Sequence, residues 1–107
     1  MSTAFVQPGV CGLKSKIVVT KKPDGGDYDV DIKIESESDN IKRLAKELTE
    51  ANGMEEVFTN FTESRIYQLG SKCGLHVACP VPSAIIKAIE VECGLALPKD
   101  VEFIITK

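Results

Sequence analysis

The alternation of apolar and charged residues over residues 27–36 constrains the fold of this chain more than any other feature. The apolar positions are Tyr28, Val30, Ile32 and Ile34, and every residue between them carries a charge. Successive side chains of a β-strand point to opposite faces, so this segment predicts a strand with one buried and one solvated face. The helices that follow it must then cover the buried face.

Residues 14–22 predict the partner strand of a hairpin, with the turn at Pro23-Asp24-Gly25-Gly26. A symmetric closure of that turn sets the register of the two strands. The expected facing pairs are Lys22 and Asp27, Val19 and Val30, Ile17 and Ile32, and Lys14 and Glu35. This register keeps the apolar side chains of both strands on one face.

Apolar residues at helical spacing follow the hairpin. Ser38 or Asp39 can cap a first helix that contains Ala51, with Gly53 just beyond its end. The apolar residues of a short second helix are Met54, Val57, Phe58 and Phe61. Those of a third helix, capped by Thr62, are Ile66, Tyr67 and Leu69. We expect the aromatic rings of these segments in the core.

A fourth helix and a closing strand complete the expected fold. Pro82 suits the first turn of a helix, and Gly94 stands where that helix should stop. Residues 101–106 are β-branched and aromatic, which predicts a third strand beside the first or second. We therefore expect one α+β domain over residues 1–107, a two-layer ββαααβ arrangement in which helices pack on one face of a small three-stranded sheet.

Charge and hydropathy exclude two broad classes of partner. A formal net charge of −3 and an acidic pI near 5.1 argue against nucleic-acid binding, which requires a basic surface. No apolar segment approaches the length of a membrane span, and the N-terminus lacks the basic start and apolar run of a secretory signal. We expect a cytoplasmic protein that interacts with neither nucleic acid nor membrane and whose partner, if it has one, is a protein.

Four cysteines in a reducing compartment are better explained as core thiols, metal ligands or redox groups than as structural disulfides. Cys73 and Cys79 flank His76, the only histidine, in an apolar connection that leads to the last predicted helix. A compact turn could bring these three side chains around one ion, and Cys11, in a glycine-flanked loop, could supply a fourth ligand. The set predicts a zinc site or ligands for an iron–sulfur cluster.

Other uses of these residues stay open. Cys79 precedes a helix, where unpaired amides and the helix dipole favour a thiolate, but it could also be a packed thiol beside two prolines. His76 could be an ordinary loop residue. Cys93 shares the apolar stripe of Ile86, so we expect it in the core. An enzyme with Cys79 as nucleophile and His76 as base lacks an evident orienting acid, which makes a non-enzymatic protein the better expectation.

Two segments of the chain resemble a known family. Residues 79–91, which begin Cys-Pro-Val-Pro, and residues 94–101, which begin Gly-Leu-Ala-Leu-Pro, are similar to a family of small uncharacterised proteins found in archaea and anaerobic bacteria. Val10-Cys11-Gly12 and the order of hairpin and helices are similar too. The resemblance covers most of the chain and implies no established activity.

The resemblance implies a site built around Cys11 and Cys79, because these two match the family pattern better than Cys73 or Cys93. An anaerobic setting would suit an oxygen-sensitive cluster or thiolate. The leading hypothesis is a binding domain in which Cys11 and Cys79, helped by Cys73 or His76, hold a metal ion or cluster or take part in thiol redox exchange. The alternative is a structural or protein-interaction domain in which the cysteines only pack.

Overall fold

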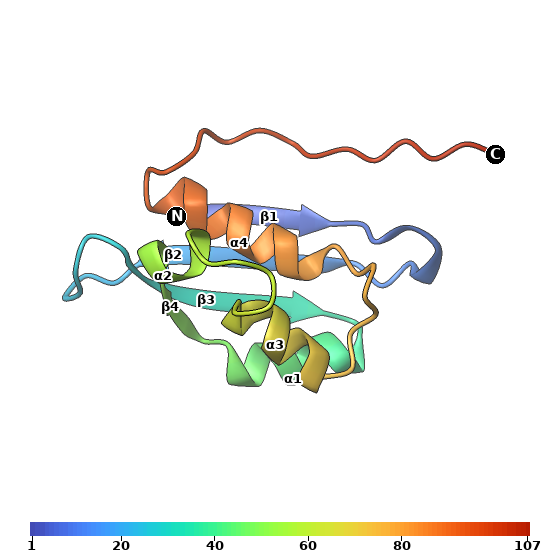
Figure 1. Ribbon diagram of the computed structural model, residues 1–107, viewed down its shortest axis with the longest axis horizontal. Helices are drawn as coiled ribbons and strands as arrows, with labels where there is room; N and C mark the ends of the chain where they lie inside the picture. The colour runs from blue at the N-terminus through green and yellow to red at the C-terminus, as the bar shows by residue number, and fades with distance from the viewer.

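The chain forms one four-stranded antiparallel sheet in the order β1-β2-β3-β4 together with four α-helices, and the computed structural model describes residues 1–107 (Figure 1). The strands are β1 (Ser2–Val6), β2 (Ser15–Lys21), β3 (Asp29–Ser36) and β4 (Glu50–Asn52). The helices are α1 (Asp39–Glu47), α2 (Gly53–Val57), α3 (Arg65–Lys72) and α4 (Val81–Glu92), and a short 3₁₀ helix, η1 (Gly9–Cys11), joins β1 to β2.

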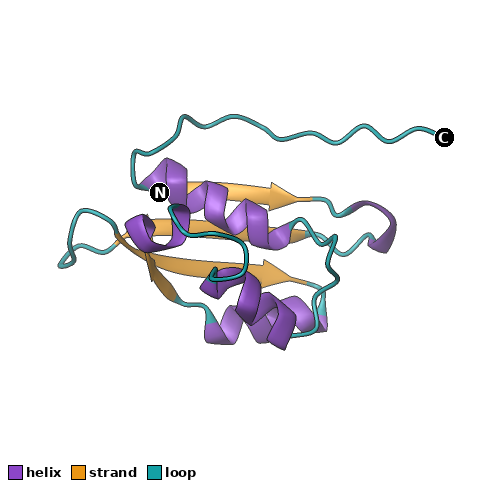
Figure 2. Cartoon of the chain, in the orientation of Figure 1, coloured by secondary structure: helices purple, strands orange, loops and turns teal.

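The helices lie on one face of the sheet, so the fold has two layers (Figures 1 and 2). α4 packs on β1 and β2, whereas α1 packs on β3 and α3 contacts both α1 and α4. On the opposite face of β3, Asp31, Lys33 and Glu35 are exposed. The two faces of the sheet therefore differ sharply in polarity, as the alternation in the sequence requires.

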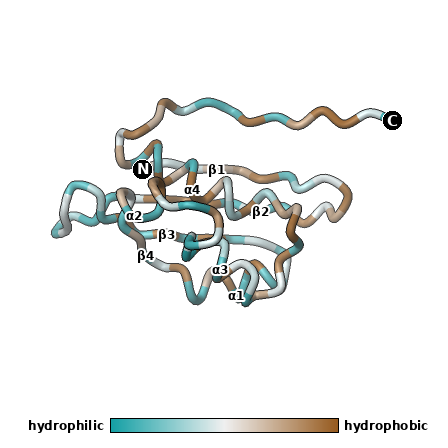
Figure 3. The backbone as a smooth tube through the Cα atoms, viewed as in Figure 1, coloured by the Kyte–Doolittle hydropathy of each residue, from teal (hydrophilic) through white to brown (hydrophobic).

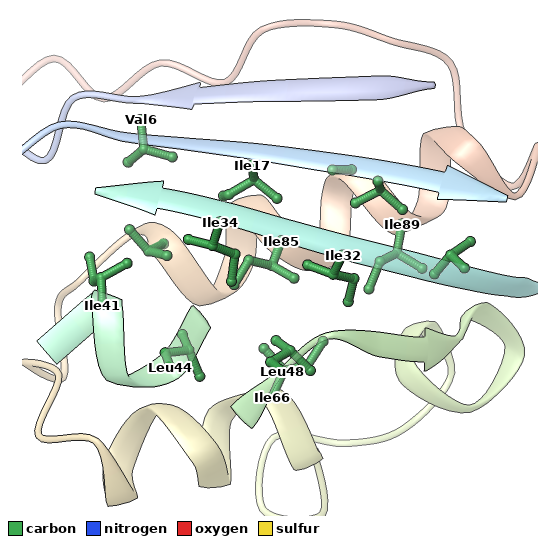
Figure 4. Close-up of a cluster of buried hydrophobic side chains, with 14 of the residues drawn as sticks. Val6, Ile17, Ile32, Ile34, Ile41, Leu44, Leu48, Ile66, Ile85 and Ile89 are labelled. Atoms are coloured by element: carbon green, nitrogen blue, oxygen red, sulfur yellow. The ribbon is translucent and has the colours of Figure 1, made fainter. Parts of the chain in front are cut away.

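The alternating strand supplies the centre of the core. Val30, Ile32 and Ile34 of β3 are buried, and Ile85 and Ile89 of α4 lie against the same layer (Figure 4). The whole buried cluster comprises Val6, Ile17, Val19, Val30, Ile32, Ile34, Ile41, Leu44, Leu48, Ile66, Cys73, Val81, Ile85, Ala88, Ile89 and Cys93. Each large aliphatic side chain stabilises the fold by about 1.5–3 kcal/mol when it is buried, so this cluster is the main source of stability.

The hairpin closes two residues away from the predicted register, which is therefore wrong. The facing pairs are Ile17 and Ile34, Val19 and Ile32, and Lys21 and Val30. The turn is longer than the four residues expected, and it is closed by a hydrogen bond of 3.0 Å from the Lys22 amide to the Asp29 carbonyl. Because the shift is an even number of residues, the same side chains still face the core.

The first helix is shorter than predicted. α1 begins after the expected cap Ser38, whose hydroxyl accepts a hydrogen bond from the Ile41 amide. It ends at Glu47, and the residues expected in its last turn instead form β4, where Ala51 faces Val30. Pairing with β3 satisfies backbone groups that would otherwise be buried without partners, and this requirement overrides helical spacing.

The predicted three-stranded ββαααβ arrangement is wrong, and the chain is instead an α+β fold with a four-stranded sheet. Residues 101–106, expected to form the closing strand, belong to no strand. Two strands, β1 and β4, were not predicted: β1 pairs antiparallel with β2, and β4 pairs antiparallel with β3. The burial of the five residues of β1 alternates, but their sequence, Ser-Thr-Ala-Phe-Val, lacks the alternation of apolar and charged residues that revealed β3.

The expectation that the aromatic residues after α2 belong to the core is also wrong. Phe58 and Phe61 are 67% and 80% exposed, because α2 ends at Val57 and neither ring stands on its buried face. Phe61 instead meets Tyr67 edge to face, with ring centroids 5.9 Å apart. The third helix is capped by Ser64, not by Thr62.

Gly53, the first residue of α2, packs closely against Cys93, the residue that caps the end of α4. A Cβ atom at this position would lie 2.5 Å from the Cys93 sulfur and 3.3 Å from its Cβ. We expect Gly53→Ala to lower the free energy of unfolding by about 1–3 kcal/mol through overpacking, and to cost less in a Cys93→Ala background. Urea denaturation of the unsubstituted chain, the two single variants and the double variant measures this difference.

The matched control is Gly70→Ala, whose new Cβ would meet Leu75 and Pro82 at an ordinary 3.6 Å. This change lies within α3, where alanine favours the helix, and should leave the stability equal or slightly higher. Equal costs of Gly53→Ala with and without the Cys93 sulfur would contradict the close packing of these two residues.

Candidate interaction surface

The structure separates the four predicted metal ligands by environment. Cys11 is exposed in η1, His76 is exposed in the connection between α3 and α4, and Cys79 is half-buried just before α4. The 3₁₀ helix and the α3–α4 connection lie toward the same end of the molecule (Figure 2). Cys73, by contrast, is buried at the end of α3.

The two buried thiols are engaged in packing. The Cys73 thiol donates to a Glu47 carboxylate oxygen at 3.5 Å, and its pKa is raised by burial and by this carboxylate. The Cys93 thiol lies 3.7 Å from the Tyr28 carbonyl oxygen, and burial raises its pKa too. The prediction that Cys93 belongs to the core is confirmed. A raised pKa keeps both thiols protonated, which disfavours metal ligation and nucleophilic chemistry at these positions.

No group of three or more His, Cys, Asp or Glu side chains is arranged to hold a metal ion. The coordination of zinc or of an iron–sulfur cluster by Cys11, Cys73, His76 and Cys79 therefore stays a prediction from the sequence. A polar hollow near β4 is lined by Lys22, Asp29, Glu50, Ala51, Asn52, Glu55 and Arg65. It is no better as a site for an anionic ligand, because both of its cations are already paired with carboxylates. Lys22 Nζ lies 2.6 Å from Glu50 Oε2 and 3.0 Å from Asp31 Oδ1.

The strongest candidate for an interaction is the C-terminal segment, residues 98–107, which we call the C-terminal arm. It forms neither helix nor strand and makes no backbone hydrogen bond. Its apolar side chains are exposed: Val101 by 58%, Phe103 by 75%, Ile104 by 80% and Ile105 by 90%. Figure 3 shows the arm apart from the sheet and helices, with several hydrophobic (brown) positions along it. The sequence predicts a strand at residues 101–106, and the exposed, unpaired arm shows that this prediction is wrong for the single chain.

The arm leaves α4 through a fixed turn. The Leu95 amide donates to the Glu90 carbonyl at 2.8 Å, and the Gly94 amide donates to the Val91 carbonyl at 3.1 Å. Gly94 has a φ of +72°, which an L side chain rarely adopts, so glycine is needed here. The two hydrogen bonds close the end of the helix and set the direction in which the arm departs.

The second part of the candidate surface is the free edge of β1. β1 pairs only with β2, so half of its backbone amides and carbonyls point away from the sheet. Phe5, the fourth of the five residues of this strand, is 75% exposed on the open face, with the Lys16 ammonium 5.8 Å from its ring centroid. An exposed strand edge beside an aromatic ring is a template for another strand. Phe5 was not identified from the sequence, because β1 was not.

Glu92 holds this edge strand to α4. Its carboxylate accepts hydrogen bonds from the Ser2 hydroxyl at 2.9 Å and the Lys21 amide at 3.0 Å, and the Met1 amine lies 3.1 Å away. Burial raises the pKa of Glu92, but these donors lower it by more, so the pKa lies below its usual value. The ionised carboxylate therefore stabilises the contact between α4, β1 and β2.

A carboxylate whose pKa is lower in the folded chain stabilises the fold above its unfolded-state pKa of about 4.3, and this stabilisation is lost as the pH falls through the folded-state pKa. We expect Glu92→Gln to lower the free energy of unfolding by about 1–2 kcal/mol at pH 7 and by progressively less toward pH 3. Urea denaturation over this pH range measures the effect.

The control for this pH series is Glu90→Gln, on the same helix, because the Glu90 carboxylate makes no ion pair that would be lost. The free energy of unfolding of the Glu90→Gln variant should equal that of the unsubstituted chain at every pH. A loss for Glu92→Gln that is the same at pH 7 and pH 3 would show that the ionised carboxylate is not what holds β1.

Comparisons with known proteins identify a family without an assigned activity. A protein-family model described as a family of unknown function, DUF6951, matches residues 2–105. No curated protein and no solved structure matches the chain. The archaeal source and the Cys-Pro-Val-Pro motif as a family feature stay predictions. None of the helices combines the length and the apolar composition that crossing a bilayer requires.

Proposed function

We propose that this chain, which belongs to DUF6951, a family of unknown function, is a protein-interaction domain whose contact element is the C-terminal arm. The observation that carries the proposal is the exposure of Phe103, Ile104 and Ile105, three consecutive large apolar side chains that are at least 75% exposed. Burying each of them against a partner would contribute about 1.5–3 kcal/mol. Large apolar side chains exposed together in this way mark an interaction site.

The arm's sequence also favours a particular mode of binding. Residues 101–106 are Val-Glu-Phe-Ile-Ile-Thr, a composition typical of a β-strand. Because the arm's backbone is unpaired, it can supply main-chain hydrogen bonds to an exposed sheet edge while its side chains fill pockets on either face. The arm therefore fits a partner that binds it by adding it as a strand.

A photo-crosslinking residue tests this function. Placed at Ile104, p-benzoylphenylalanine should form a discrete crosslinked product in cells that make the full chain, since this side chain would lie in the interface. Adding Phe103→Asp should reduce the product at least about tenfold, because it removes one buried apolar anchor of about 1.5–3 kcal/mol. Gel electrophoresis with mass spectrometry identifies the product.

The control for the crosslinking experiment is the same residue at Val77, which is fully exposed and apolar but lies in the α3–α4 connection. Crosslinking from position 104 that is no stronger than from position 77 would overturn the proposed function.

A second candidate is metal binding or thiol redox exchange at Cys11 and Cys79, helped by His76. The observation that favours it is that neither thiol is fully buried, and that the elements which carry them, η1 and the α3–α4 connection, lie toward one end of the molecule. A cation held by two thiolates would protect them from alkylating reagents.

Alkylation with iodoacetamide without oxygen tests this second candidate. Zinc or ferrous iron should slow the modification of Cys11 and Cys79 together, while Cys73 and Cys93 react slowly in every case because they are buried with raised pKa values. Peptide mass spectrometry reads out each thiol. Unchanged rates at Cys11 and Cys79 with either metal would remove metal binding from consideration.

A further inference from the structure

We infer that the C-terminal arm binds the free edge of β1 in a second copy of this chain, so that two copies exchange arms about a two-fold axis. This inference rests on the proposed function of the arm and names its partner. The interface would contain two equivalent contacts, each made by residues 101–106 of one copy and Ser2–Val6 of the other.

The arm and the edge match in length and pattern. β1 has five residues, and residues 101–106 supply six in an extended form. In a strand, the side chains of Val101, Phe103 and Ile105 would face one side and those of Glu102, Ile104 and Thr106 the other. The first set is entirely apolar and suits the helix-covered face of the sheet, whereas the second mixes polar and apolar groups and suits the open face.

α4 presents an apolar flank to the apolar set beside β1. At about 100° per residue, Ala84 and Val91 fall on one flank of α4, opposite Cys93. Cys93 faces α2 on the β3 side of the sheet, so the flank with Ala84 and Val91 faces the free edge of β1. Both residues of that flank are half-buried, so each keeps part of its apolar surface available to an added strand. An added strand would thus continue the two-layer core.

The open face offers a complementary contact. Phe5 is 75% exposed there, and a strand added to β1 would place a residue of the mixed set next to its ring. Ile104 is the apolar member of that set, and it is 80% exposed in the single chain. Burial of Phe5 and Ile104 against each other would cover apolar surface on the one face that the helices leave open.

The count of complementary parts favours a second copy as the partner. Each chain carries one arm and one free long edge, so a reciprocal exchange uses both arms and both edges and closes after two copies. An unrelated partner that bound the arm would leave the edge of β1 open. The arm is long enough to pair with the whole of β1 in another copy. Its ten residues span up to about 33 Å when extended, whereas a five-residue strand is about 17 Å long.

Complementation between two defective chains tests the exchange. Phe103→Asp/Ile105→Asp disables the arm, and Phe5→Glu disables the edge with a carboxylate on an exposed position. The unsubstituted chain should have about twice the mass of the 11.6 kDa monomer by light scattering and sedimentation. Each variant alone should be monomeric, because both arms or both edges are missing.

The mixture of the two variants should then form a heterodimer, since the intact arm of the Phe5→Glu chain meets the intact edge of the other. Native mass spectrometry distinguishes it by mass. With one contact in place of two, it should dissociate at least about tenfold more readily than the unsubstituted dimer. Val77→Asp, at an exposed apolar position away from both elements, should remain dimeric, and circular dichroism checks that every variant is folded.

Each other outcome overturns the inference. A dimer of the arm variant would mean that β1 pairs with β1, and a dimer of Phe5→Glu would mean that the arms pair with each other. A monomeric unsubstituted chain, or a mixture that stays monomeric, excludes the exchange. If residue 104 then crosslinks to a different protein, the proposed function stands without the exchange, whereas the loss of that crosslink overturns the proposed function as well.

Discussion

The burial of one face of β3 is the constraint on which the rest of the structure depends. Val30, Ile32 and Ile34 stand on that face, and no water-exposed arrangement of this strand is stable while they are uncovered. β2 extends the face with Ile17 and Val19, and α4 and α1 close over it. The positions of α2 and α3 then follow from α4, since both pack against it.

The sequence predicts which side chains are buried, but it does not predict the strand register. Side-chain alternation fixes which residues face the core, so the buried members of β3 and the stripe of α4 that ends in Cys93 could be predicted. It does not fix the register, because a shift of two residues preserves every face. The pairing of Ile17 with Ile34 is instead set by the seven residues that connect Lys21 to Asp29.

The two outer strands of the sheet, β1 and β4, cannot be identified from the sequence for a related reason. Both are short, and each forms because the neighbouring strand has unpaired backbone groups, not because of its own composition. Ala51 has the spacing of a helix residue but pairs with Val30, and Phe5 has no local pattern that marks it as an edge residue. The grouping of the thiols in the sequence suggests one site but not their environments: the fold buries Cys73 and leaves Cys11 exposed.

Amino-acid composition indicates whether a segment favours the β conformation. Whether it forms a strand depends on whether the fold offers a neighbouring strand to pair with. The composition of residues 101–106 is typical of a strand, yet the segment forms no strand in the single chain. Because α4 ends in a closed turn at Gly94, the arm departs in a direction set by two hydrogen bonds rather than by its own side chains. Its apolar residues then remain exposed at a free-energy cost that only another surface can remove, which is why the arm is more informative about function than the cysteines are.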